Sequence, residues 1–141
     1  MMDLTQREDH RHFTTVTLRY ADTDRQGHVN NAIFATFLES GRTAIFFGAD
    51  KPIAPAGASF VLARLALDFL AEVHWPGEVV VGTTVLRLGN SSVTFGQGIF
   101  FEGKCVAKAE SVIVLIDETT RKSRHLPEES RKAFEKYCRP Q

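Results

Sequence analysis

The loop from Arg19 to Asn31 holds the residues of this chain whose types and spacing are best suited to chemistry. It contains two carboxylates, an imidazole and two asparagine amides, which are Asp22, Asp24, His28, Asn30 and Asn31. An apolar helical pattern follows at once, and the first turn of a helix leaves backbone N–H groups without intrahelical partners and carries partial positive charge. Such a helix start can polarise a carbonyl and hold a developing oxyanion, while a neighbouring carboxylate attacks the carbonyl or activates water.

Asp24 is the candidate carboxylate, either as a nucleophile or as a general base. Aspartate also favours turns and helix caps, so a purely structural role is the competing interpretation. Asp22 is expected to order the loop through backbone hydrogen bonds or through a pair with Arg19 or Arg25. His28 could orient Asp24, bond the substrate or assist the leaving group, or it could only hold the loop in place.

Asn30 and Asn31 suit the start of the helix as capping residues. That role is compatible with function, because a well-formed cap presents the backbone amides that a carbonyl oxygen needs. Gly27 is expected to allow a close backbone approach or a positive φ angle. Gly27 and Asn30 are therefore candidate substrate-binding positions.

Changes in the spacing of apolar residues predict the elements around this loop. Between residues 31 and 48 they recur every three or four positions, which predicts a helix that is apolar over most of its circumference. A short strand precedes the loop, and Pro127 opens a short C-terminal helix. Between the two helices, short turns join four long predicted strands, over residues 59–70, 79–88, 92–101 and 105–116.

The first of these long strands is expected to bury one continuous apolar face. That face comprises Val61, Ala63, Leu65, Leu67 and Phe69. Arg64 and Asp68 lie on the opposite, mixed face, where contact with solvent or an interface is the plainer interpretation.

A buried helix followed by an antiparallel meander predicts an α+β fold, in which a strongly curved five-stranded sheet wraps around the central helix. The 141 residues fit one domain, with residues 1–11 expected to be a flexible N-terminal segment. Long apolar edge strands invite pairing with a second copy, so at least a homodimer is expected, and a homotetramer stays open.

Composition excludes several classes of function. The chain has 17 basic and 17 acidic residues and zero formal net charge, which argues against nucleic-acid binding through an overall positive field. It has no run of apolar residues long enough for a membrane span, and its charged N-terminus lacks the apolar core of a secretory signal, so the cytoplasm is the expected location. Cys105 and Cys138 lack metal or redox spacing, and the five histidines form no recognisable ligand pattern.

The sequence resembles the hotdog-fold thioesterases, in particular the branch of 4-hydroxybenzoyl-CoA thioesterase and related short acyl-CoA thioesterases. The strongest part of the resemblance is residues 20–34, YADTDRQGHVNNAIF, which match the acidic, glycine-containing His-Val-Asn-Asn loop of the family and the helix start behind it. Residues 60–70, FVLARLALDFL, resemble the second strand of the family, and the meander that follows adds weaker support.

This resemblance implies hydrolysis of acyl-CoA thioesters without a metal or an organic cofactor, at an active site in a dimer interface. By position, the catalytic carboxylate of the family falls on Asp24, and the backbone N–H that binds the thioester oxygen falls on Asn31. Relatives that use coenzyme A often carry basic residues around the third and fourth strands. Here the local sequence offers Arg87, which joins Arg64 as a candidate substrate-binding residue; a carrier-protein thioester would need less positive charge.

Two other functions compete with thioester hydrolysis. Hydration or dehydration of enoyl thioesters uses an Asp and a His with a water molecule, and Asp24 with His28 could form such a pair. A binding module for acyl thioesters would keep the pocket and show no turnover.

Overall fold

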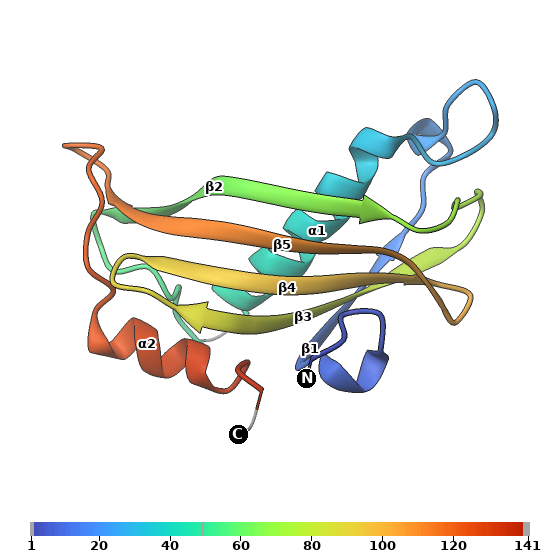
Figure 1. The fold of residues 1–141 in the computed structure, drawn as a ribbon. Helices are drawn as coiled ribbons and strands as arrows, with labels where there is room; N and C mark the ends of the chain where they lie inside the picture. The colour runs from blue at the N-terminus through green and yellow to red at the C-terminus, as the bar shows by residue number, and fades with distance from the viewer. Residues whose placement is uncertain (1, 49, 140–141) are drawn as a thin grey trace.

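One antiparallel sheet of five strands, in the order β1-β3-β4-β5-β2, wraps around the long helix α1 (Figure 1). The computed structural model describes residues 2–48 and 50–139. In chain order the elements are η1 (Arg7–Asp9), β1 (His12–Thr17), η2 (Tyr20–Asp22), α1 (Asn31–Phe46), β2 (Ala58–Phe69), β3 (Glu78–Leu88), β4 (Ser92–Phe101), β5 (Lys104–Asp117) and α2 (Glu128–Glu135). The expected hotdog fold is confirmed.

Helix α1 begins where the sequence predicts and ends close to the expected position. The Asn30 side chain caps it by accepting a hydrogen bond from the Ala32 N–H at 2.9 Å. One face is buried against the sheet, and its residues recur at helical spacing: Phe34, Phe37, Leu38, Gly41, Arg42 and Ile45. This burial holds the N-terminal end of α1 in a fixed position beside the loop.

The middle of α1 lies unusually close to the sheet at Gly41. A Cβ atom added there would lie 2.7 Å from Gln97 Nε2, 2.8 Å from Val81 Cγ1 and 2.9 Å from Thr83 Oγ1. Gln97 is itself fixed, because its Nε2 donates to the Leu38 carbonyl and to Thr83 Oγ1, both at 3.0 Å. The absence of a side chain at position 41 therefore sets how closely the helix packs on the sheet.

The prediction that β2 buries one continuous face is wrong, because a bulge at Ala63 reverses which side chains of the strand point toward the core. Leu62 pairs with Ile113 and Arg64 with the adjacent Val112, which leaves Ala63 as an extra residue. Before the bulge Phe60 points inward and stacks on Phe46, with ring centroids 4.9 Å apart. After it Leu65 and Leu67 pack against the core. Side chains of a strand alternate between its two faces, so one inserted residue exchanges the faces for every residue after it. Val61 and Ala63 therefore do not share the inward face of Leu65.

Residues 2–11 pack on the sheet, in contrast to the flexible segment that the polar sequence predicts. His10 is 3% exposed, and its Nε2 lies 2.8 Å from the Leu4 carbonyl oxygen. Three glycines on the outer face of β3 and β4 make room for Leu4 and His10, because a Cβ at any of them would collide with this segment. These residues are Gly82, Gly96 and Gly98.

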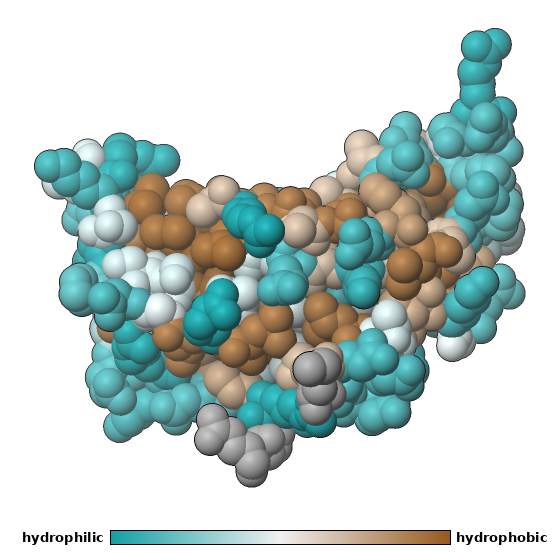
Figure 2. Space-filling view, in the orientation of Figure 1, coloured by the Kyte–Doolittle hydropathy of each residue, from teal (hydrophilic) through white to brown (hydrophobic). Residues whose placement is uncertain are grey.

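Two apolar surfaces stay uncovered by the described residues of the single chain. The first is the free edge of β2, with the neighbouring loop, where Leu62 is 50%, Phe69 48% and Leu70 47% exposed. Figure 2 shows the second, the sheet face turned away from α1, where apolar surface spreads over the middle between separate polar side chains. Among the described residues, no helix has both the length and the apolar character that crossing a bilayer would require.

Candidate active site

The first half of the loop is tied together by Asp22, which is 3% exposed. Its carboxylate accepts hydrogen bonds from the backbone N–H of Arg19 at 3.0 Å and from the Arg19 guanidinium at 2.7 and 3.1 Å. Its backbone carbonyl accepts from the Asn30 N–H at 2.8 Å, directly before α1. Burial by itself raises the pKa of Asp22, but the hydrogen bonds and charge of Arg19 outweigh it and hold the pKa below its ordinary value of 3.8. The role expected for Asp22 as the residue that orders the loop fits these contacts.

Replacing Asp22 by asparagine is expected to lower the free energy of unfolding at neutral pH by about 1–3 kcal/mol, the range for a buried hydrogen-bonded charge. Because the folded pKa lies below the unfolded one, this stabilisation is present above a pH of about 4 and is lost as the pH falls through the folded pKa. Urea unfolding of the native and D22N proteins from pH 7 to 3 measures both effects. The exposed carboxylate of Asp68 provides the control variant, D68N. A difference between D22N and the native protein that stays constant down to pH 3 would contradict this prediction.

The second half of the loop is a tight turn built on Asp24. The Asp24 N–H donates to the His28 carbonyl at 2.7 Å, and Asp24 Oδ1 accepts from the N–H groups of Gln26 at 2.9 Å and His28 at 3.2 Å. Gly27 has a φ of +83°, which a residue without Cβ adopts at little cost. Asp24 therefore has a structural role through Oδ1, while Oδ2 has no hydrogen-bond partner among the described residues.

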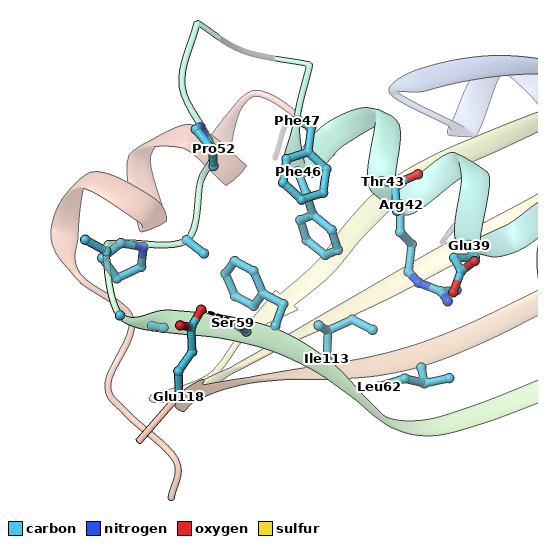
Figure 3. Close-up of a pocket in the computed structure, with 16 residues that line it drawn as sticks. Glu39, Arg42, Thr43, Phe46, Phe47, Pro52, Ser59, Leu62, Ile113 and Glu118 are labelled. Carbon is cyan, nitrogen blue, oxygen red and sulfur yellow. Dashed lines mark hydrogen bonds between the residues drawn. The ribbon is translucent and has the colours of Figure 1, made fainter. Parts of the chain in front are cut away.

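Two cavities lie along α1, and only one contains the candidate residues. The larger, of about 560 Å³, lies between the C-terminal half of α1, the 52–57 loop and β2 (Figure 3). Its walls include the stacked rings of Phe46 and Phe60, a 5% exposed Arg42, and the Ser59 hydroxyl that donates to Glu118 at 2.7 Å. No residue of the 19–31 loop lines it.

The other cavity, of about 380 Å³, opens at the N-terminal end of α1. Asp24, His28 and Asn31 all line it, with Gln26 and Glu72 completing the polar wall. Its apolar wall comes from Val29, Phe34, Phe69, Leu70 and Ala71. The structure thus brings the three candidate catalytic residues together around one space that has both a polar and an apolar side.

Asn31 lines this cavity, and its backbone N–H is the first of α1. The Ala32 N–H is used by the Asn30 side chain and the Ile33 N–H by the Asn30 carbonyl, at 2.9 Å each. Within residues 2–48 and 50–139, no hydrogen bond is formed by the Asn31 N–H. An N–H in the first turn is directed out of the helix and carries the positive end of the helix dipole. A carbonyl oxygen in the cavity could accept its hydrogen bond.

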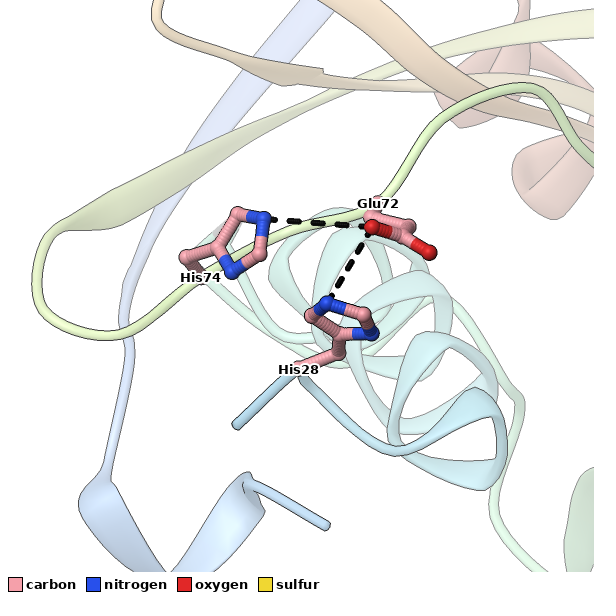
Figure 4. A group of neighbouring side chains, drawn as sticks. All are labelled: His28, Glu72 and His74. Atoms are coloured by element: carbon pink, nitrogen blue, oxygen red, sulfur yellow. Dashed lines mark ion pairs between the residues drawn. The ribbon is translucent and has the colours of Figure 1, made fainter. Parts of the chain in front are cut away.

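His28 and Glu72, which line the cavity, form a cluster with His74 (Figure 4). His28 Nε2 lies 3.2 Å from Glu72 Oε2, and His74 Nε2 lies 3.9 Å from the same oxygen. The two imidazole rings meet edge to face, with centroids 4.6 Å apart. The site residues predicted from the sequence include neither Glu72 nor His74, because the contact with His28 joins residues that are far apart along the chain.

The other predicted site residues fall into two groups. Asn30 caps α1 and Gly27 forms the turn, so both shape the cavity without lining it. Arg64 is exposed on β2 directly after the bulge, and Arg87 is exposed on β3, where its Nη2 lies 3.4 Å from Thr94 Oγ1. Neither arginine lines the cavity within this chain.

Comparison with known proteins finds the same fold in thioesterases. The family model of the thioesterase-like superfamily matches residues 18–134. The PA5185 protein of Pseudomonas aeruginosa PAO1 is 28% identical, with a TM-score of 0.84 and 94% of each chain covered. A thioesterase from Thermus thermophilus, solved in complex with coenzyme A and Zn, is 31% identical, with a TM-score of 0.76 and coverage of 86% of this chain and 95% of that one. A predicted thioesterase from Bacillus stearothermophilus is 26% identical, with a TM-score of 0.79 and coverage of 89% and 95%.

Proposed function

Because this chain belongs to the thioesterase-like superfamily, we propose that it is an acyl-CoA thioesterase, which hydrolyses acyl thioesters to a free acid and a thiol. One observation carries the proposal: Asp24, His28 and the first residue of α1 line a single cavity. A carboxylate beside a helix N-terminus supplies two groups that can together hydrolyse a carbonyl compound, a base or nucleophile and a donor to the oxyanion.

In the proposed reaction the thioester carbonyl oxygen accepts a hydrogen bond from the Asn31 N–H, which stabilises the oxyanion that forms on attack. Asp24 Oδ2 takes a proton from a water molecule that adds to the carbonyl carbon, or itself attacks that carbon to form an anhydride that water then opens. In either route the C–S bond breaks, and the thiolate leaves and takes up a proton. His28 is suited to direct the leaving group or the carboxylate, since it lies on the same wall. The chain's own residues and water suffice, so no cofactor is proposed.

Coenzyme A is the proposed thiol because the thioesterase of Thermus thermophilus, 31% identical to this chain, was solved with it. The apolar wall of the cavity, which includes Phe34 and Phe69 with ring centroids 5.2 Å apart, is suited to the acyl group. The arginines expected to bind phosphate, Arg64 and Arg87, lie away from the cavity of their own chain. Their contribution would come from the partner subunit of an oligomer.

The proposed assembly is a homodimer, or a homotetramer built from two dimers. The free edge of β2 and its neighbouring loop expose Leu62, Phe69 and Leu70, and the last two also line the cavity. A second copy that covers this edge would bury apolar surface and close the cavity at the same time. The apolar sheet face in Figure 2 offers a second contact for a tetramer.

The direct test is release of free thiol from a panel of short, long and aromatic acyl-CoA substrates, with acyl-carrier-protein thioesters as a second panel. The same samples, with crotonyl-CoA added to the panel, are assayed for hydration of the double bond. Thiol release supports the proposal. Hydration without thiol release would assign the protein to the hydratases, and binding of acyl-CoA without either reaction would make it a binding module.

A further inference from the structure

We propose that His28, Glu72 and His74 bind one divalent transition-metal ion of the zinc type beside the cavity, which the first two of them line. This inference goes beyond thioester hydrolysis and does not depend on it, because metal binding is measured without a substrate. The cluster unites two imidazoles and a carboxylate from two separate segments of the chain.

The backbone sets the positions of all three residues. Residues 28 and 74 form an antiparallel bridge, and the next residue strengthens it, since the Val29 N–H donates to the Val73 carbonyl at 2.8 Å. Opposite residues in such a pair hold their side chains about 4.5–5.5 Å apart at Cβ. In an extended segment Glu72 and His74 lie on one side and Val73, which is fully buried, lies on the other. The three candidate ligands therefore share one face.

Two of the three distances between the candidate donor atoms are close to those of a zinc site. All three donor atoms lie within 4.8 Å of one another. With bonds of about 2.0–2.1 Å, neighbouring ligand atoms in a tetrahedron are about 3.3–3.4 Å apart. His28 Nε2 and Glu72 Oε2 already lie 3.2 Å apart, and the 3.9 Å between Glu72 Oε2 and His74 Nε2 needs a shift of only a few tenths of an ångström. The shift is available, because the Glu72 and His74 side chains are 66% and 57% exposed.

The donor set selects the class of metal. Imidazole nitrogen is a preferred ligand of zinc, copper, nickel and iron, whereas magnesium and calcium take oxygen ligands almost exclusively. Two histidines with one glutamate also match the three-ligand zinc sites that keep a fourth position open. Here the open position can be taken by water, and the exposure of Glu72 and His74 leaves a path for the ion to enter.

Isothermal titration of the metal-free protein with Zn²⁺ tests this site. The native protein is expected to bind one Zn²⁺ per chain. Replacing His74 by alanine is expected to weaken Zn²⁺ binding by at least about tenfold, because loss of a residue that only supports a metal ligand already has an effect of this size. The E72Q variant is expected to weaken binding by a similar factor. Both changes lie at exposed positions, so the variants are expected to fold. His125, exposed and outside the cluster, provides the matched control H125A, whose affinity should equal that of the native protein.

The ring nitrogen resonances of the histidines provide an independent readout. Addition of Zn²⁺ should shift the signals of His28 and His74 and leave that of His125 unchanged. Absence of one-to-one binding to the native protein, or equal affinity in the native and H74A proteins, would overturn the proposal. So would zinc binding that shifts His125 and not His74.

Discussion

Replacing Asp24 by asparagine is expected to lower kcat for thiol release by about 10²–10⁴-fold, the usual contribution of a general acid–base group. The structure makes this variant informative, because Asp24 Oδ1 accepts the Gln26 and His28 N–H groups and the amide oxygen of asparagine can accept the same two bonds. The turn is thereby kept, and only the charged Oδ2, which has no partner among the described residues, is lost. The measurement is kcat and KM for the best acyl-CoA substrate.

The control for this experiment is D68N, which removes an exposed carboxylate from β2. Its kcat should equal that of the native protein. If D24N keeps native kcat while the native protein releases thiol, Asp24 has only its structural role as the residue that forms the turn. In that case the catalytic carboxylate must be sought elsewhere, with Glu72 the nearest candidate because it lines the same cavity.

Replacing Gly41 by valine is expected to lower the free energy of unfolding by about 3 kcal/mol, at the upper end of the usual cost of overpacking a core. The first added carbon alone would lie within 2.9 Å of Gln97, Val81 and Thr83. Gln97 cannot move aside freely, because it donates hydrogen bonds to Leu38 and Thr83 inside the core. The loss should exceed any gain from replacing glycine within a helix, which is at most about 1 kcal/mol.

Chemical unfolding of the native, G41A and G41V proteins measures this effect, and the loss should grow with the size of the side chain. Thr36, exposed on the same helix, provides the control T36V, which places the same β-branched residue away from the sheet. T36V should change stability by no more than about 0.5 kcal/mol. Equal stability of G41V and the native protein would mean that the contact between α1 and the sheet yields without cost.

The sequence predicted those parts of the candidate site whose arrangement has a local cause. Asp24, Gly27 and His28 form one turn and Asn31 begins the helix shortly after it, and both the turn and the helix cap are set by neighbouring residues. The helix behind them was also predictable, because its apolar residues repeat with a regular period over several turns.

The parts that the sequence did not predict depend on contacts between distant segments. His28 and His74 meet only because two loops pair across the end of the fold, and no spacing rule connects them. The bulge at Ala63 is a second case. The sequence of β2 still reads as one continuous strand, but the extra residue reverses which side chains face the core after it. The N-terminal segment is a third, since its polar composition gives no sign of the space above the sheet that receives His10.

That space has a consequence for how this sequence can change during evolution. The His10 ring occupies the volume above Gly82, where a Cβ atom would lie 2.6 Å from His10 Cγ, so a larger residue at position 82 would require a smaller one at position 10. Residues in such direct contact do not contribute independently to stability. Among related sequences we therefore expect positions 10 and 82 to covary, although they lie far apart along the chain.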